Sequence, residues 1–280
     1  MGNLRFRSDR SELTVAIASA TVTLTPDATR LDDTVAVVTG AAVGIGRATA
    51  LALAAFGADV AVCDRDEVNL STCIDEIEAL GVRAFAGVLD VRDGEQVRAW
   101  VELVAQRFGR IDVVVNNAGG GFFSDFLDVS ENGQDALVRE NFMSVTNFVR
   151  AAVPHIPASG GSIINITSIE AHRAAPGYAV YSAMKAAVAN LTESLALELG
   201  ARSIRANCVA PDVIPTPGIG EVPVRTPLPR AGHVDDVAAS VVFLANPALS
   251  GFVTGTTLHV DGGNHAAGGW RREPDGSFTT

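Results

Sequence analysis

The feature that most constrains the fold is a regular alternation, after Pro26, between short apolar runs and longer segments with apolar residues at helical spacing. The apolar runs lie at 34–40, 58–64, 82–90, 111–119, 161–168, 203–211 and 256–263, and the helical segments at 44–57, 67–80, 94–108, 134–155, 178–200 and 234–244. Apolar strands separated by helices of this length are typical of βαβ units around a buried parallel sheet. We therefore predict an α/β fold, a Rossmann-like doubly wound parallel β-sheet with helices on both faces.

The same alternation predicts how the chain divides. No break in composition interrupts residues 31–263, so we expect a single domain there. Residues 1–30 would form an N-terminal extension, in which alternating apolar residues favour a short β-hairpin arm. Residues 264–280 would form a C-terminal tail.

Charge and composition argue against several classes of function. The net charge of -11 repels nucleic acid and anionic membrane surfaces, and no apolar run reaches the length of a membrane span. Three cysteines without CxxC spacing indicate free thiols in a reducing compartment, which favours a cytoplasmic protein. The five histidines show no metal-ligand spacing, so we predict no metal site.

A glycine-rich turn joins the first apolar run to the first helical segment. Gly40, Gly44 and Gly46 are spaced G-x-x-x-G-x-G, a relative of the dinucleotide-binding pattern. Glycines permit close approach of the backbone, and the N-terminus of the following helix favours a pyrophosphate. We expect this turn, including Val43 and Ile45, to hold the phosphates of a dinucleotide cofactor.

The second predicted strand ends at Asp64, and Arg65 follows it. A carboxylate at this position can accept hydrogen bonds from the ribose hydroxyls of the adenosine, and it repels a 2′-phosphate. We therefore expect NAD rather than NADP, a preference that Arg65 could soften. The alternative interpretation is that Asp64 is the N-cap of the next helix.

The segment "YSAMK" contains Tyr181 and Lys185, and Lys185 is the only lysine of the chain. On a helix these residues are i and i+4, so they project from one face. The ammonium is expected to lower the pKa of Tyr181 from its ordinary value of about 10, which makes proton transfer to or from a substrate oxygen feasible. Ser168, at the end of the fifth predicted strand, could donate a hydrogen bond to the same oxygen.

Several motifs follow one another in a characteristic order between residues 31 and 263. They are "TGAAVGIG", "DV" at 90–91, "NNAG", "ENFMS", a serine at 168, "YSAMK", "PDVIPTP" and "DGG". In this order and spacing the chain resembles the short-chain dehydrogenase/reductase family. The resemblance implies a nicotinamide-dependent oxidoreductase that assembles as a homotetramer or homodimer.

The resemblance also assigns roles to individual residues. The implied catalytic residues are Asn141, which would hold a water in a proton relay, together with Ser168, Tyr181 and Lys185. The further cofactor contacts that it implies are Asp90, Val91, Asn117, Ala118, Gly119, Tyr181, Lys185, Pro211, Ile214 and Thr216.

One residue departs from the family pattern, and it lies on the substrate side. Asp212 follows Pro211 where the family usually has glycine, so a carboxylate is expected near the nicotinamide or the substrate. Six prolines between residues 211 and 229 favour an extended loop over a helical lid. The candidate substrate contacts are Gly121, Phe122, Glu170, His172 and Tyr178.

These features lead to one predicted function and two alternatives. The prediction is an NAD(H)-dependent oxidoreductase that interconverts a secondary alcohol and a ketone, with Tyr181 as the acid and base. The alternative within enzymes is an NADPH-dependent 3-oxoacyl reductase, against which Asp64 argues. The alternative from another class is a non-catalytic cofactor-binding regulatory or scaffold protein, which the presence of both Tyr181 and Lys185 disfavours.

Overall fold

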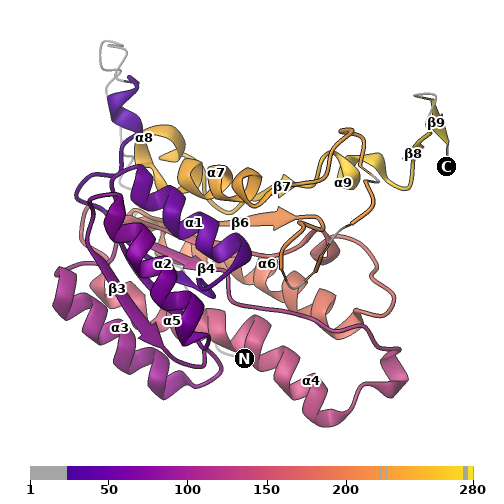
Figure 1. Ribbon diagram of the computed structural model, residues 1–280, viewed down its shortest axis with the longest axis horizontal. Coiled ribbons are helices and arrows are strands. Elements are labelled where there is room, and N and C mark those ends of the chain that lie inside the picture. Colours follow the sequence, from indigo (N-terminus) through magenta and orange to yellow (C-terminus); the bar gives the residue numbers. More distant parts are fainter. Residues whose placement is uncertain (1–23, 218, 221, 225, 274–276, 280) are drawn as a thin grey trace, which may run out of the picture.

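A parallel β-sheet forms the centre of the computed structural model, which describes residues 24–217, 219–220, 222–224, 226–273 and 277–279 (Figure 1). Its seven strands lie in the order β3-β2-β1-β4-β5-β6-β7, and each neighbouring pair is parallel. The strands are β1 Val35–Thr39, β2 Asp59–Asp64, β3 Ala84–Val88, β4 Val113–Asn116, β5 Gly161–Ile166, β6 Ile204–Pro211 and β7 Thr257–Val260. The predicted fold class is confirmed.

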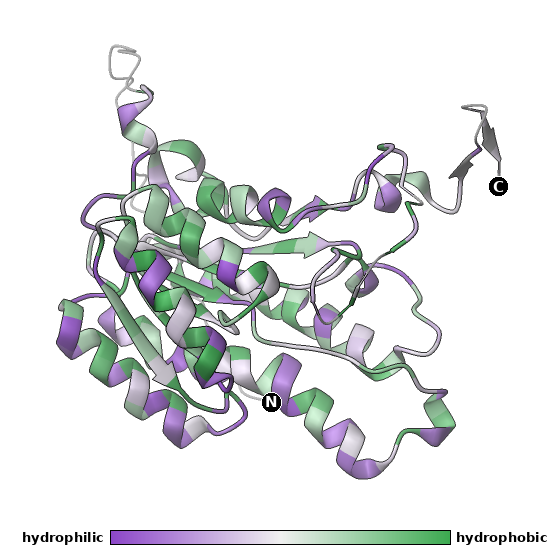
Figure 2. Cartoon of the chain, in the orientation of Figure 1, coloured by the Kyte–Doolittle hydropathy of each residue, from purple (hydrophilic) through white to green (hydrophobic). Residues whose placement is uncertain are grey.

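Helices cover both faces of this sheet. One face packs against α1 (Gly44–Ala55), α2 (Glu67–Ala79) and α7 (Val234–Ala245). The other packs against α3 (Gly94–Phe108), α5 (Ser144–Ala152) and α6 (Ala179–Leu199). Hydrophobic residues run along the strands and the helix faces turned toward them, whereas hydrophilic residues gather on the outer faces (Figure 2). The sheet therefore has a separate apolar core on each side.

The strand order changes direction beside β1, and this fixes where a ligand can bind. From β1 the chain proceeds through β2 to β3 on one side, and then returns to β4 on the other side of β1. The connections after β1 and β4 consequently diverge to opposite faces of the sheet. In open parallel sheets the crevice beyond the carboxyl ends of such strands is the ligand site.

One long predicted helix has a different internal structure. The segment expected as a single helix over 134–155 is a helical run that includes α4 (Glu131–Val138), a π-helical turn (Arg139–Met143) and α5. A π turn inserts one extra residue and rotates the side chains that follow it, and such turns are frequent at functional sites. Apolar periodicity does not report it, because the residues on either side still recur at helical spacing.

Other segments lie outside the sheet and its two helical layers. The described residues of the loop between β6 and α7 form no helix, as the prolines predict. The short helices α8 (Pro247–Ser250) and α9 (Asn264–Ala267) flank β7, and the strands β8 (Arg271–Arg272) and β9 (Phe278–Thr279) project beyond α9 near the C-terminus (Figure 1). No helix within the described part of the chain is long and apolar enough to cross a membrane.

The predicted boundaries of the domain at residues 30 and 263 stay predictions. All seven strands of the sheet fall between them. The predicted N-terminal hairpin arm would occupy residues that lie outside the described ranges, and α9, β8 and β9 belong to the predicted tail.

Candidate functional site

The glycine-rich turn after β1 packs directly against the loop after β4. Gly40 has a φ of +65°, and a Cβ there would lie 2.9 Å from the Cα of Ala118. A Cβ on Gly46 would overlap the carbonyl oxygen of Gly40. Both positions therefore need glycine, one for its backbone conformation and both for the close approach of two chain segments.

The N-terminus of α1 offers free donors at this turn. Its N-cap residue is Val43, whose side chain makes no capping hydrogen bond. The first-turn N–H groups of a helix have no partner within the helix, and together with the helix dipole they favour an anion. The side chain of Thr216, from the loop after β6, lies next to Gly44. The turn thus fits the pyrophosphate of a nicotinamide dinucleotide.

Asp64, at the end of β2, also faces this turn. Its Oδ2 accepts a hydrogen bond from the backbone N–H of Ala42 at 3.0 Å, and its Oδ1 accepts from the N–H groups of Arg65 and Asp66. The N-cap of α2 is Asp66, whose side chain accepts from the N–H of Asn69. The alternative interpretation of Asp64 as that N-cap is therefore wrong, and its carboxylate is fixed at the carboxyl edge of the sheet.

The loop after β4 is tied to β1 by side-chain hydrogen bonds. The Thr39 hydroxyl accepts from the N–H groups of Asn117 and Ala118 at 3.0 and 2.9 Å. The Asn117 amide donates in return to the carbonyl oxygens of Thr39 and Gly40. The predicted cofactor residues from β1 and from β4 are consequently held in one rigid wall.

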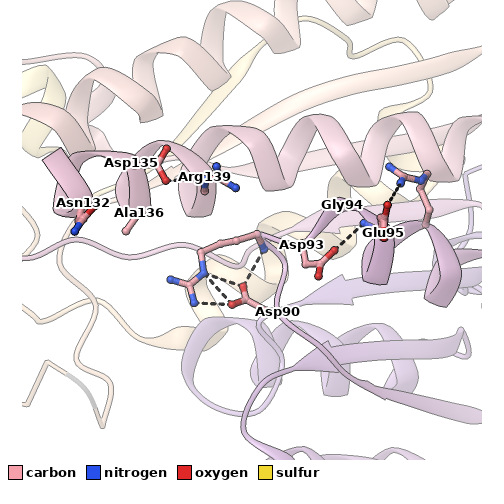
Figure 3. Close-up of a pocket in the computed structure, with 10 residues that line it drawn as sticks. Asp90, Asp93, Gly94, Glu95, Asn132, Asp135, Ala136 and Arg139 are labelled. Atoms are coloured by element: carbon pink, nitrogen blue, oxygen red, sulfur yellow. Dashed lines mark hydrogen bonds and ion pairs between the residues drawn. The ribbon is translucent and has the colours of Figure 1, made fainter.

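Asp90 and Val91 follow β3 at the same edge. Val91 is buried, and the Arg92 guanidinium binds Asp90 through paired hydrogen bonds that hold the pKa of its carboxyl below the ordinary value. A cavity of about 580 Å³ opens beside Asp90, between the start of α3 and α4 (Figure 3). Its arginines have carboxylate neighbours in the pairs Arg92–Asp90, Arg98–Glu95 and Arg139–Asp135, so we assign it no ligand.

The four predicted catalytic residues converge where β4 and β5 end. Ser168 directly follows β5, while Tyr181 and Lys185 lie on α6. Ser168 lies close enough to Tyr181 to lower the pKa of its phenol in part, and the Lys185 Nζ lies 5.7 Å from the centroid of the Tyr181 ring. The Lys185 Nζ donates to the carbonyl oxygen of Ile166 at 3.0 Å, which anchors the ammonium at the end of β5.

Asn141 lies in the π turn and is fully buried. Its amide nitrogen donates to the carbonyl oxygens of Gly120 and Leu137, and its Oδ1 accepts from the N–H of Gly120. A Cβ on Gly119 would lie 2.8 Å from the Oδ1 of Asn141 and 2.9 Å from the Nζ of Lys185. The Gly119 backbone therefore lies against both side chains, and a residue with a Cβ would crowd them.

Burial dominates the electrostatics of this cluster. It lowers the pKa of Lys185 to about 8, while burial raises the pKa of Tyr181, partly offset by the hydrogen bond with Ser168. The expectation that Lys185 gives Tyr181 a lowered pKa is thus wrong for this geometry. Desolvation is the largest influence on the pKa of the phenol, and the Lys185 ammonium is directed at the Ile166 carbonyl.

Comparison with known proteins agrees with this arrangement. Residues 40–265 match the family model described as enoyl-(acyl carrier protein) reductase. The chain is 39% identical over 243 residues to a 3-oxoacyl-[acyl-carrier-protein] reductase of Thermotoga maritima, with 84% of this chain and 98% of the relative covered. The chain belongs to the short-chain dehydrogenase/reductase family.

Two solved structures of this family extend the comparison. A short chain dehydrogenase of Mycobacterium paratuberculosis bound to NAD is 32% identical and superposes with a TM-score of 0.80, covering 85% of this chain and 99% of that one. A short chain dehydrogenase of Burkholderia cenocepacia in complex with NADP is 36% identical, also with a TM-score of 0.80, and covers 83% and 98%. The chain is therefore a nicotinamide-dependent oxidoreductase that acts on CH–OH or C=O groups.

The predicted substrate residues of this dehydrogenase do not all lie together. Gly121 packs under the Tyr181 ring, since a Cβ there would lie 3.1 Å from it. The Tyr178 ring packs edge-on against the Tyr181 ring at 6.3 Å and the Phe123 ring at 5.7 Å. Phe122 lines the same small hollow as both tyrosines. These aromatic rings form one apolar side of Tyr181.

Glu170 and His172 point to a second group of side chains that sequence reasoning missed. Glu170 binds Arg173 through two hydrogen bonds of 2.7 and 3.2 Å. The His172 ring contacts the rings of His259 and His265, which stack on each other at 4.1 Å. Within the described ranges no three His, Cys, Asp or Glu side chains have the geometry of a metal site. Only the topology brings His172 to His259 and His265, because β7 and α9 lie far from His172 in sequence.

The loop after β6 completes the site. Pro211 pairs with Val260 in the sheet, and the buried side chain of Ile214 lies against Gly232, so only the backbone of Ile214 remains to contact a cofactor. The carboxylate of Asp212 accepts hydrogen bonds from the Asn264 side chain at 2.7 Å and from the N–H of Val213. The residue that departs from the family pattern therefore links this loop to α9.

Proposed function

We propose that this dehydrogenase uses NAD(H) to interconvert a secondary alcohol and a ketone, with Tyr181 as the proton donor and acceptor. The observation that carries the proposal is the placement of Tyr181 close to Ser168 and to the buried Lys185, at the edge where the glycine turn fits a dinucleotide. This constellation supplies proton transfer and carbonyl polarisation at one point.

Each member of the cluster has a distinct role in this proposal. The nicotinamide cofactor supplies the hydride in ketone reduction and accepts it in alcohol oxidation. Tyr181 donates a proton to the substrate oxygen during reduction and removes it during oxidation. Ser168 donates a hydrogen bond to the same oxygen. Lys185 holds the ribose hydroxyls with its ammonium, and Asn141, fixed by Gly120 and Leu137, positions a water that returns the proton to Tyr181.

Asp64 supports NAD as the preferred cofactor. Its fixed carboxylate at the end of β2 suits the ribose hydroxyls and repels a 2′-phosphate. Arg65 follows it and lies close enough to Asp90 to lower the pKa of that carboxyl, so a positive charge is also present. The preference therefore rests on Asp64 and is moderated by Arg65.

The second candidate is an NADPH-dependent 3-oxoacyl reductase. The observation that favours it is the 39% identity to the reductase of Thermotoga maritima. The two candidates share every catalytic residue and differ in the cofactor and in the length and charge of the substrate.

The test is a screen of secondary alcohols, simple ketones and a 3-oxoacyl thioester, with NAD(H) and NADP(H), followed at the nicotinamide absorbance. The proposal predicts turnover of ketones or alcohols and tighter binding of NADH than of NADPH. Tighter binding of NADPH with turnover confined to the thioester would establish the second candidate. Binding of either cofactor without turnover of any compound would favour a non-catalytic protein.

Assembly and location stay predictions. We infer a homotetramer or homodimer in the cytoplasm, from the family resemblance and from the three buried free cysteines. Sedimentation velocity would test the first, since a monomer at micromolar concentration contradicts it.

A further inference from the structure

Arg173 lies among three carboxylates that come from three different elements. It binds Glu170, which precedes it by three residues, and its Nη2 lies 3.8 Å from the Oδ1 of Asp212 on the loop after β6. Asp261, which directly follows β7, adds to the same electrostatic stabilisation of the Arg173 cation. We call Glu170, Arg173, Asp212 and Asp261 the acidic rim.

The rim lies at the catalytic edge of the sheet. Glu170 is two residues after Ser168, and its charge is close enough to Tyr181 to raise the pKa of that phenol. Asp212 follows the carboxyl end of β6, and Asp261 follows that of β7. Asp212 and Asp261 line one cavity of about 370 Å³ together with the ion pair of Arg230 and Asp236. A substrate whose carbonyl oxygen reaches Tyr181 therefore approaches the rim at Glu170.

Within the described part of the chain, the arginines at the rim and its cavity, Arg173 and Arg230, are both engaged by carboxylates. Glu170 and Asp212 lie within 4 Å of the Arg173 guanidinium, and both side chains are less than a quarter exposed, so solvent screens them incompletely. His172 and His259 border the rim, and burial lowers the pKa of both, so at neutral pH they add little positive charge. Arg173 is occupied by its carboxylates and does not offer a site for an anionic substrate group.

We infer that the acidic rim makes this dehydrogenase select uncharged carbonyl compounds against those carrying an anionic group near the reacting carbon. The inference rests on the proposed function and specifies its substrate class. Asp212 determines the selection, because its carboxylate lies beside Arg173 and is only slightly exposed. A carboxylate on the substrate meets repulsion from the rim, where Arg173 is already paired with Glu170.

A matched pair of compounds tests the inference. Acetoacetamide and acetoacetate have the same shape and differ by one charge. Each is measured as a substrate. A compound that is not turned over is measured as a competitive inhibitor of the ketone that the screen shows to be reduced fastest. We expect the amide to be favoured in kcat/KM or in inhibition constant by roughly three- to tenfold at low salt, with a smaller ratio at high salt.

Variants locate the source of the selection. Asp212→Asn retains the side-chain volume and removes a charge, and Asp212→Gly restores the usual family residue. Both should reduce the preference for the amide toward equality. Glu78→Gln is the matched control, because Glu78 is an exposed carboxylate on α2, away from the rim, and its removal should leave the ratio unchanged.

The outcomes separate this inference from the proposed function. Reduction of the screened ketones with equal use of amide and anion, or with preference for the anion, overturns the inference and leaves the function intact. If Asp212→Asn prefers acetoacetamide over acetoacetate by the same ratio as the unaltered enzyme, the role of Asp212 is overturned. Absence of turnover of every ketone with either cofactor overturns the proposed function and the inference together.

Discussion

The cofactor side and the substrate side of the cleft are built from different kinds of contact. Between β1 and β4 the cleft is held by backbone atoms, as where Asp64 binds the Ala42 N–H and Asn117 binds the carbonyl of Gly40. Beyond β5 it is held by charged side chains from separate elements, as where Arg173 faces Glu170 and Asp212. The first side has one rigid geometry, whereas the second can be changed by single side chains with little effect on the backbone.

This difference has a physical cause. Phosphates and ribose hydroxyls are the same in every cofactor molecule, so backbone N–H groups at a helix end and one fixed carboxylate recognise them. Substrates differ in size and charge, and loops on a rigid scaffold accommodate such variation. The comparison can be tested by substitutions on each side of the cleft.

The largest effect on cofactor binding should come from the backbone of the cofactor side. Gly46→Ala places a Cβ against the carbonyl oxygen of Gly40, so the turn must shift, and cofactor affinity should fall by roughly ten- to a hundredfold. Titration of NADH by fluorescence measures this. Gly200→Ala is the control, since its Cβ would enter open space and NADH affinity should not change. Unchanged affinity in Gly46→Ala would show that the turn does not contact the cofactor.

A smaller effect is expected at the carboxylate of the same side. Asp64→Asn retains the acceptor for the Ala42 N–H but removes the charge that repels a 2′-phosphate. The ratio of NADPH to NADH dissociation constants should fall by roughly tenfold. Glu67→Gln, an exposed charge removal at the start of α2, should leave this ratio as it is. A ratio that Asp64→Asn does not alter would move the source of cofactor choice to Arg65.

The smallest effect is a change of pH dependence from the substrate side. Glu170 raises the pKa of Tyr181, so Glu170→Gln should lower it. Alcohol oxidation requires the phenolate and should then begin to rise at lower pH, while ketone reduction requires the phenol and should begin to decline at lower pH. Profiles of kcat/KM against pH measure both limbs. Limbs that stay in place, or move to higher pH, would show that Glu170 does not act on Tyr181.

The same contrast explains what the sequence could predict. The strands, the glycine turn and the placement of Tyr181 and Lys185 follow from local patterns, because spacing along one strand or helix determines which residues share a face. Asp64 was predicted at the right edge, since it ends a strand that the apolar run defines. These features needed no knowledge of distant contacts.

The remaining features depend on contacts that no local pattern contains. The π turn around Asn141 inserts one residue into an otherwise regular helix. Arg173 has significance only because the topology places the loops after β5, β6 and β7 side by side. The pKa of Tyr181 was predicted to be lowered and is raised, since burial depends on the whole packed structure. Charge balance at a site is therefore harder to predict from sequence than its backbone.

The central claim is that Tyr181 transfers the proton while the cofactor side binds independently of it. The most direct measurement is a single-turnover reduction of a ketone by NADH, in the unaltered enzyme and in Tyr181→Phe, together with NADH affinity for both. The account predicts unchanged affinity and a rate lower by roughly 10²- to 10⁴-fold in the variant. A Tyr181→Phe rate within a few-fold of the unaltered enzyme would contradict it.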